Sequence, residues 1–320
     1  DEEVQIMNQS KQLTDGALMA GVFIVLVLIA AFIPFVSLIA SVLLPIPFII
    51  YAYRYNWRPS LLLLVVISLL TILFATFISL PLAIIPGLGG MMIGIAMHQQ
   101  LTPYETWARG TVGFIFGFLF TYVFTQFVMD INLMQVYEQM IQQSFDQTKH
   151  FFKQFSMGTD VDEQMKLFEK QLPLIMNLFP MLLVIGALFM AFLSQWIGYK
   201  VINRLEKKTF RFPPFRQLSF PVTIIWLYFI AMLISFMNLD PEGYVAISTQ
   251  NVMNLLGFFM TIQGVSFIFF FAYKKKISKT LPIIVTIFIV LLSPFLIPLV
   301  RILGIIDLGF RLRERIDVKI

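Results

Sequence analysis

The sequence contains no cysteine, which excludes disulfides, thiol chemistry and metal sites built on thiolates. It also lacks the G-x-x-x-x-G-K-[ST] phosphate loop, the H-E-x-x-H helix and the G-x-S-x-G turn. Its two histidines, His98 and His150, fall in connections that we expect on opposite sides of a membrane, so they cannot share a metal. We therefore predict no enzyme, no resident metal and no cofactor.

Charged residues are scarce as well, at 13% of the chain against about 25% in an ordinary soluble domain. Hydrophobic residues make up 58%, and the mean hydropathy is +0.84. Apolar runs recur that are long enough, at about 1.5 Å per residue, to cross a hydrocarbon core about 30 Å thick. An unpaired backbone group is costly in lipid, so the runs must be helices. The sequence predicts an all-α, polytopic integral membrane bundle.

Nine apolar segments follow a polar start, at 16–33, 35–53, 60–80, 82–97, 111–129, 173–197, 218–237, 248–273 and 281–300. The first is too long for a cleaved signal and is expected to be a retained anchor. The fourth is the weakest, because the run Pro86 to Gly90 disfavours a regular helical turn. Pro294 and Pro298 predict that the last segment is broken or re-entrant, so we expect eight or nine crossings. All belong to one membrane domain, 1–320, with an interfacial tail at 301–320.

Lysine and arginine in the connections predict the orientation, because short cytoplasmic loops are enriched in both. The connections 200–216 and 274–279 carry six and four of them. Placing both in the cytoplasm puts Arg54 and Arg109 there too, and it places the amino terminus in the cytoplasm. We therefore expect a multi-pass protein of the bacterial plasma membrane. The formal net charge of only +5 gives no reason to expect a nucleic-acid partner.

The longest polar stretch, 130–172, is expected outside the cell. Apolar residues such as Val136, Met140 and Phe151 recur near helical spacing among glutamines, which predicts an amphipathic helix. Gly158 to Asp160 then separates it from a second short helix at 161–171. This extracytoplasmic hairpin either rests on the membrane surface or forms a lid over an outward-facing cavity.

Polar side chains within the apolar segments are candidates for function, because burial in lipid requires a partner for each. They are Gln126, Ser194, Gln195, Asn251, Asn254 and Gln263. Asn251 and Asn254 lie three residues apart on one helical face near the outer end of their segment, and Gln126 is expected at a similar depth. These three side chains either line an outward-opening polar pocket or form interhelical hydrogen bonds. Arg301 and Asp307 are expected at the membrane interface.

Glycines in the fourth segment have two interpretations. Gly87, Gly89 and Gly90 could form a partly unwound turn whose free backbone groups bind a solute. Alternatively, the four-residue spacing from Gly90 to Gly94 makes a small face on which another helix packs closely. In the first segment, a second small face is formed by Gly16, Ala17, Ala20 and Gly21. That face is predicted to pack against a helix of this chain or of a partner.

The order of these features resembles the YybS family of multipass membrane proteins of Gram-positive bacteria. The resemblance is carried by Ala17 to Gly21, by Pro45 and Pro47 in the second segment, by Pro86 to Gly94, and by Leu303 to Asp307 with the arginines that follow. That family is in turn distantly similar to the substrate-binding S-components of energy-coupling-factor vitamin transporters and to the rod-shape protein MreD. The S-component likeness implies that Ala17 and Gly21 dock on a transmembrane coupling subunit.

Two functions follow as expectations. The first is a non-enzymatic subunit that binds a small, largely neutral or aromatic solute at Gln126, Asn251, Asn254, Gly87, Gly89 and Gly90. Such a subunit depends on a coupling subunit and ATPases for energy, because it has no ATPase motif of its own. The second is a membrane scaffold in cell-envelope or nucleotide-signalling assembly, favoured by the small helix faces and basic loops.

Overall fold

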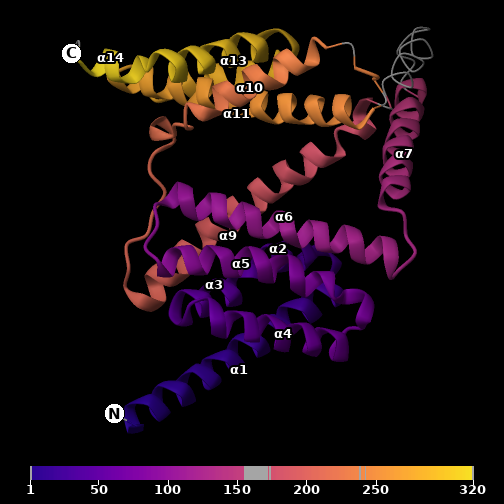
Figure 1. Cartoon of the computed structure of the whole chain (residues 1–320), viewed down its shortest axis with the longest axis vertical. Coiled ribbons are helices and arrows are strands. Elements are labelled where there is room, and N and C mark those ends of the chain that lie inside the picture. Colours follow the sequence, from indigo (N-terminus) through magenta and orange to yellow (C-terminus); the bar gives the residue numbers. More distant parts are fainter. Residues whose placement is uncertain (1, 155–171, 173, 238, 242, 319–320) are drawn as a thin grey trace. The chain divides into compact units, whose positions relative to one another are not determined.

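The computed structural model of the chain describes residues 2–154, 172, 174–237, 239–241 and 243–318. Within these ranges the chain is helical and contains no strand (Figure 1). The α-helices are α1 (Glu2–Phe32), α2 (Pro34–Leu43), α3 (Pro45–Tyr55), α4 (Trp57–Phe74), α5 (Pro81–His98), α6 (Pro103–Phe127), α7 (Leu133–Gln154), α9 (Phe179–Glu206), α10 (Thr223–Ser235), α11 (Tyr244–Lys274), α12 (Thr280–Leu291), α13 (Ser293–Phe310) and α14 (Leu312–Val318). Two short 3-10 turns, η1 (Phe77–Ser79) and η2 (Phe215–Gln217), precede α5 and α10.

Seven of the described segments are long and apolar enough to cross a membrane: Gln9–Ala30, Trp57–Phe74, Phe77–His98, Pro103–Phe127, Phe179–Glu206, Tyr244–Lys274 and Ser293–Phe310. Three shorter apolar helices accompany them, at Ile39–Tyr55, Thr223–Ser235 and Thr280–Leu291. The prediction of an all-α polytopic membrane bundle is confirmed.

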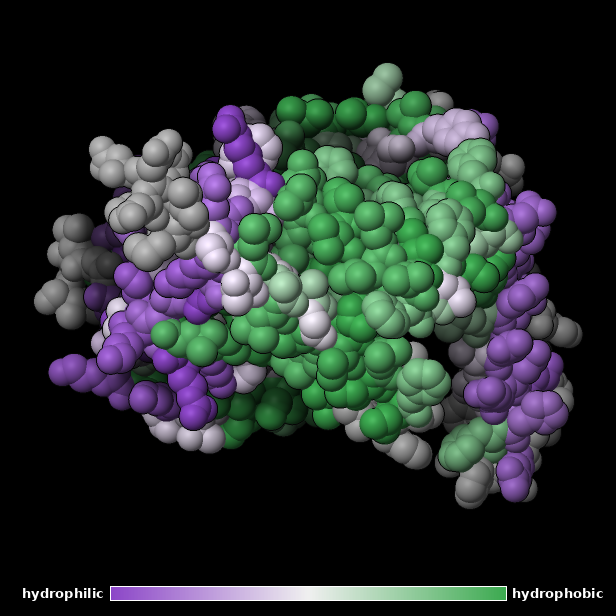
Figure 2. All heavy atoms as spheres, turned by 90° about the horizontal axis from the view of Figure 1, so that it is seen from below, coloured by the Kyte–Doolittle hydropathy of each residue, from purple (hydrophilic) through white to green (hydrophobic). Residues whose placement is uncertain are grey.

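The side chains of α4 show why this chain suits lipid rather than water. Leu69 and Leu73 are 62% and 75% exposed, whereas Ser60 and Thr71 are fully buried. The two buried hydroxyls donate to the carbonyls one turn earlier, at 2.6 and 2.8 Å, and so bring no unpaired donor into the interior. On the side of the molecule where α1 and α4 lie, hydrophobic side chains form a broad band with hydrophilic ones gathered at its margins (Figure 2).

The helices form two compact units. Unit 1 comprises residues 1–176 and 182–212, and unit 2 comprises 177–181 and 213–320. The expectation of a single membrane domain remains a prediction, because two packed groups of helices can belong to one membrane domain.

Unit 1 is centred on α5, which packs against α3 and α6. A side chain at Gly90 would meet the carbonyl oxygen of Pro45 at 2.5 Å, and one at Gly94 would meet that of Ile49 at 2.6 Å. On the α6 side, Gly113 approaches the carbonyl of Leu88 in the same way. The small faces therefore serve close helix packing, as one of the two interpretations predicted.

The other interpretation, an unwound turn at Pro86 to Gly90, is wrong, because α5 is continuous from Pro81 to His98. Pro86 lies inside the helix and lacks only its own backbone donor. In lipid, unwinding would leave several backbone groups unpaired at several kcal/mol each, which outweighs the low helix propensity of glycine.

One end of unit 1 is held by polar contacts between helix ends. Arg54, at the end of α3, pairs with Asp15 of α1 at 2.8 Å and with Glu206 of α9 at 2.7 Å. His98, at the end of α5, shares a hydrogen bond with the carbonyl of Tyr53 through Nδ1 at 2.7 Å. The ends of α3, α5 and α9 thus lie together, as the alternating topology requires.

In unit 2, α11 and α13 run parallel. Gly304 of α13 lies against Met260 of α11, and three residues further along both helices Asp307 meets Gln263. The expected segment 281–300 is therefore two helices, since α12 ends at Leu291 and α13 begins at Ser293. Arg313, just after α13, contacts Ser266 and Phe270 of α11, so the tail lies beside the basic end of α11, as a broken segment predicted.

Helix α7 confirms the amphipathic helix expected after 130. Its apolar side chains Val136 and Met140 are 38% and 62% exposed, which suits a helix resting on a membrane surface. The second helix of the expected hairpin, 161–171, lies outside the described residues.

Candidate functional site

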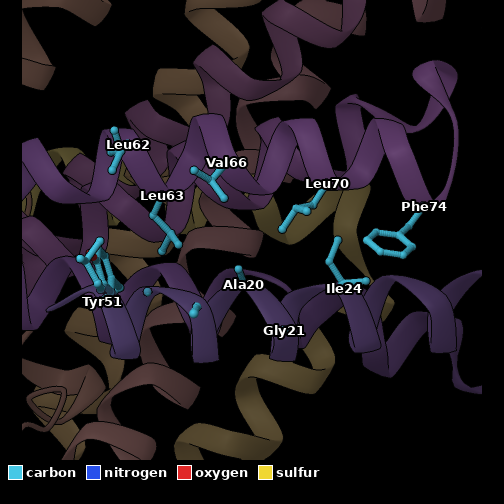
Figure 3. Close-up of a pocket in the computed structure, with 12 residues that line it drawn as sticks. Ala20, Gly21, Ile24, Tyr51, Leu62, Leu63, Val66, Leu70 and Phe74 are labelled. Atoms are coloured by element: carbon cyan, nitrogen blue, oxygen red, sulfur yellow. The ribbon is translucent and has the colours of Figure 1, made fainter. Parts of the chain in front are cut away.

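An open apolar groove runs between α1 and α4 in unit 1, with a volume of about 540 Å³. Figure 3 shows Leu63, Val66 and Leu70 of α4 pointing across it toward α1. The α1 side is formed by the predicted small face, Gly16, Ala17, Ala20 and Gly21, with Leu13 and Ile24 at its ends. The groove therefore has a smooth floor of small residues and a wall of branched apolar side chains.

The floor of the groove is unfilled along part of its length. A side chain at Gly21 would have no neighbour within 4 Å, and one at Gly16 would meet only the ring and hydroxyl of Tyr51, from 3.3 Å. The glycines of α5 differ sharply. The space at Gly87 is occupied by Leu64 and Phe48, and that at Gly89 by Phe114. Among these faces, α1 has the one with room for another molecule.

Polar contacts fix α1 at one end of this groove. Asp15 accepts hydrogen bonds from Arg54 and from the hydroxyl of Tyr55, both at 2.8 Å. The hydroxyl of Tyr51 donates to the carbonyl of Gln12 at 3.4 Å. Sequence reasoning missed this cluster. Asp15, Arg54 and Glu206 each lie near the end of an apolar segment, at ends expected on the same side of the membrane, and this pattern could have indicated the cluster.

The residues expected to line a polar pocket belong to two different units. Gln126 is half-buried on α6 of unit 1, whereas Asn251 and Asn254 belong to α11 of unit 2. Asn251 is buried and satisfies backbone groups: its amide donates to the carbonyls of Asn177 and Ile247, at 2.6 and 2.9 Å, and its oxygen accepts from Met181 N–H at 3.0 Å. Asn251 therefore forms hydrogen bonds between helices, which was one of the two roles expected for it.

The role of Asn251 can be tested by stability. We expect Asn251→Ala to lower the free energy of unfolding by about 1 to 3 kcal/mol, because it leaves buried backbone groups unpaired. Asn254→Ala, on the same helix and half-buried, should change it by less than about 0.5 kcal/mol. Denaturation of the purified chain in detergent micelles measures both. Equal effects of the two substitutions would contradict the structural role of Asn251.

A second polar cluster lies between α11 and α13 in unit 2. Asp307 is 3% exposed, and its Oδ2 accepts from the Gln263 amide at 2.6 Å and from Arg313 Nε at 2.9 Å. Arg313 also donates to the carbonyl of Arg216 at 2.9 Å and to the hydroxyl of Ser266 at 3.1 Å. The interfacial placement expected for Asp307 stays a prediction, because burial among protein side chains does not give the depth of a residue in a membrane. Helix α13 continues past Asp307 to Phe310, and the donors from Gln263 and Arg313 offset part of the cost of burying the carboxylate.

This cluster also fixes the segment before α10. Ser266 donates to the carbonyls of Phe215 and Leu218, at 2.9 and 2.8 Å, and Gln263 accepts from Phe220 N–H at 3.0 Å. The predicted intramembrane polar residue Gln263 is thus part of a structural network. Gln195 in unit 1 behaves similarly, since it donates to the carbonyl of Pro103 and to Tyr199.

The chain exposes large hydrophobic side chains, buries hydrogen-bonded polar ones and contains several helices long and apolar enough to cross a membrane. These features define a multi-pass helical membrane protein. Residues 21–308 match the family described as "Predicted membrane protein (DUF2232)", and the chain belongs to that family. It is 27% identical over 310 residues to a Bacillus subtilis (strain 168) protein named "Uncharacterized protein YybS", which covers 97% of this chain and 100% of that one. The YybS-like resemblance is therefore confirmed. No solved structure matches the chain.

Proposed function

We propose that this chain is a non-enzymatic protein of the bacterial plasma membrane that acts through a partner membrane protein, one helix of which packs into the α1–α4 groove. The observation that supports this is the unfilled small face of α1, where a side chain at Gly21 would meet nothing within 4 Å. In lipid, helices associate through van der Waals contact, and small residues allow the closest approach. A helix packed on this face would supply the contacts that the open groove lacks.

In the first version of this function, the partner is a coupling subunit and the chain is a solute-binding subunit similar to an S-component. Support comes from the position of Ala17 and Gly21 in the groove, where the S-component likeness expects the docking contact. The solute would be taken from the side opposite the Arg54 cluster, and ATPases bound to the coupling subunit would supply the energy. Of the residues expected to contact the solute, Gln126 and Asn254 are half-buried and form no side-chain hydrogen bond with another described residue.

In the second version, the chain is a scaffold for cell-envelope or nucleotide-signalling proteins. Support comes from the basic connections 200–216 and 274–279, which suit docking of an acidic partner surface or anionic lipid. This version needs no solute pocket, so it fits the structural role of Asn251.

Site-directed crosslinking in cells tests the groove. Because the chain has no cysteine, single variants can carry a photoreactive maleimide at one position. We expect Ala17→Cys, in the groove, to give a discrete protein adduct, and Leu18→Cys, 58% exposed and outside the groove lining, to give lipid adducts. Lipid adducts at both positions would mean that acyl chains fill the groove, and would overturn the proposal.

The identity of the adduct separates the two versions. A coupling subunit accompanied by ATPases supports solute uptake, whereas a wall-synthesis or nucleotide-signalling protein supports the scaffold. Equilibrium binding of candidate vitamins to the purified chain gives an independent readout. Asn254→Ala is the variant of choice there, since Asn251→Ala also alters folding; unchanged vitamin affinity would remove Asn254 from the site.

A further inference from the structure

Arg301 lies in the middle of an apolar helix. It is the ninth residue of α13, so it is about 12 Å from the start of the helix and about 13 Å from its end along the axis. The segment Ser293–Phe310 is long and apolar enough to cross a membrane, and Arg301 lies at the middle of its length. Helix α13 extends past Val300, where the apolar segment was expected to end, so Arg301 lies within a helix and not in a tail after it.

The guanidinium of Arg301 has no polar partner among the described residues. Its Nε is buried without a hydrogen bond, and no carboxylate pairs with it within 4 Å. The acidic residue of the same helix, Asp307, is held by Gln263 and Arg313 instead. An arginine at the centre of a bilayer costs at least about 2.5 to 3.5 kcal/mol, so a residue left unpaired there is a candidate for function.

The backbone of α11 makes room for this guanidinium. A side chain at Gly257 would lie 2.8 Å from Cζ and 3.0 Å from Nε of Arg301, so the planar group rests directly on the glycine. Asn254, three residues earlier on α11, is half-buried on the same face and provides an amide one turn away. The guanidinium of Arg301 thus lies flat against α11, and because Arg301 is half-buried, part of its side chain stays accessible.

The surroundings indicate the chemistry of a ligand. A guanidinium fork matches the two oxygens of a carboxylate or phosphate, and such charge-assisted pairs are strong where water is scarce. On α13, Phe295, Leu299 and Ile302 are 77%, 61% and 52% exposed, which offers an apolar surface to an alkyl chain. A charged head with an apolar tail would satisfy both.

We propose that Arg301, resting on Gly257, is an intramembrane binding site for the oxyanion of an amphipathic molecule, either a free long-chain acid or an anionic phospholipid. The juxtaposition of an unpaired arginine with a glycine cradle in the centre of two packed spans carries this inference. It lies in unit 2 and goes beyond the proposed function, which rests on the α1 groove of unit 1. Either can therefore fail without the other.

The test uses the full chain in phosphatidylcholine vesicles with three spin-labelled probes: stearate, phosphatidylglycerol and phosphatidylcholine. The wild-type chain should bind at least one anionic probe with a higher association constant than labelled phosphatidylcholine. Arg301→Gln should lower the relative association constant of that probe by about tenfold or more, the worth of a hydrogen-bonded charge. Arg301→Lys should give an intermediate value, because it keeps the charge but not the fork.

Arg311→Gln is the matched control. It removes the same charge from the end of α13, where Arg311 is 69% exposed and pairs with Glu314 at 3.8 Å. Gly257→Ala is a second variant that preserves the charge. It should reduce binding several-fold by displacing the flexible end of Arg301, and it applies even if Arg301→Gln does not fold.

The probes also separate the two sources of the oxyanion. Excess binding of stearate alone identifies a free long-chain acid, and excess binding of phosphatidylglycerol alone identifies a membrane lipid. No excess of either over phosphatidylcholine overturns the inference. Equal losses in Arg301→Gln and Arg311→Gln also overturn it, because they show a diffuse surface charge effect, as does undiminished binding in Gly257→Ala.

Discussion

Asp307→Ala is expected to lower the free energy of unfolding of unit 2 by about 3 to 5 kcal/mol, the usual cost of breaking one partner out of a buried ion pair. The substitution leaves the Arg313 side chain, 15% exposed, without its carboxylate, and it removes the acceptor of the fully buried Gln263 amide. Because the same cluster holds the segment before α10, the loss should extend beyond α13.

The matched control for this prediction is Glu314→Ala. Glu314 pairs with Arg311 at 3.8 Å, and both side chains are about 70% exposed. Exposed pairs contribute little, so the change should stay below about 0.5 kcal/mol. Denaturation in detergent micelles followed by circular dichroism measures both variants. A loss at Asp307 no larger than that at Glu314 would show that the buried pair does not stabilise the unit.

Gly304→Ala should destabilise the packing of α11 on α13 by about 2 to 4 kcal/mol, near the upper end of overpacking effects. The methyl group would overlap the carbonyl of Met260, and backbone cannot move aside as a flexible side chain can. Gly264 makes the reciprocal approach to the carbonyl of Val300. The two helices are therefore in contact at their backbones.

Gly309→Ala, five residues along the same helix, is the control. Its methyl group would meet Ile225 at 3.7 Å, which is ordinary van der Waals contact. Alanine is the better helix former by about 1 kcal/mol, so this variant should be neutral or slightly more stable. If Gly304→Ala and Gly309→Ala have the same melting temperature, the close approach of α11 and α13 is not as described.

The sequence carried most of the information on the spans, because length and hydropathy alone decide whether a helix can cross lipid. It also marked Gly90 and Gly94 as a packing face, since four-residue spacing puts small residues on one side of a helix. It failed at Pro86, where local propensity favours unwinding but the bilayer makes unpaired backbone more costly than a strained turn.

The site could be predicted only in part. The small face of α1 follows from the spacing of Gly16 to Gly21, but whether it is covered depends on α4, which no local pattern reveals. Asn251 was identified as a residue that needs a partner, and its partners at Asn177 and Met181 are some 70 positions away in the chain. Arg301 and Asp307 were assigned to a tail because a single boundary, set at Val300, removed both from the helix that contains them.

The arrangement of α12 and α13 has a consequence for biogenesis. At 12 residues α12 is about 18 Å long, too short to traverse the apolar core independently. It becomes stable only as the outgoing arm of a hairpin whose returning arm is α13. We therefore expect the translocon to release both arms together, after Gly304 has been synthesised and can meet α11. Polypeptides truncated between the two arms should fail to integrate and be degraded.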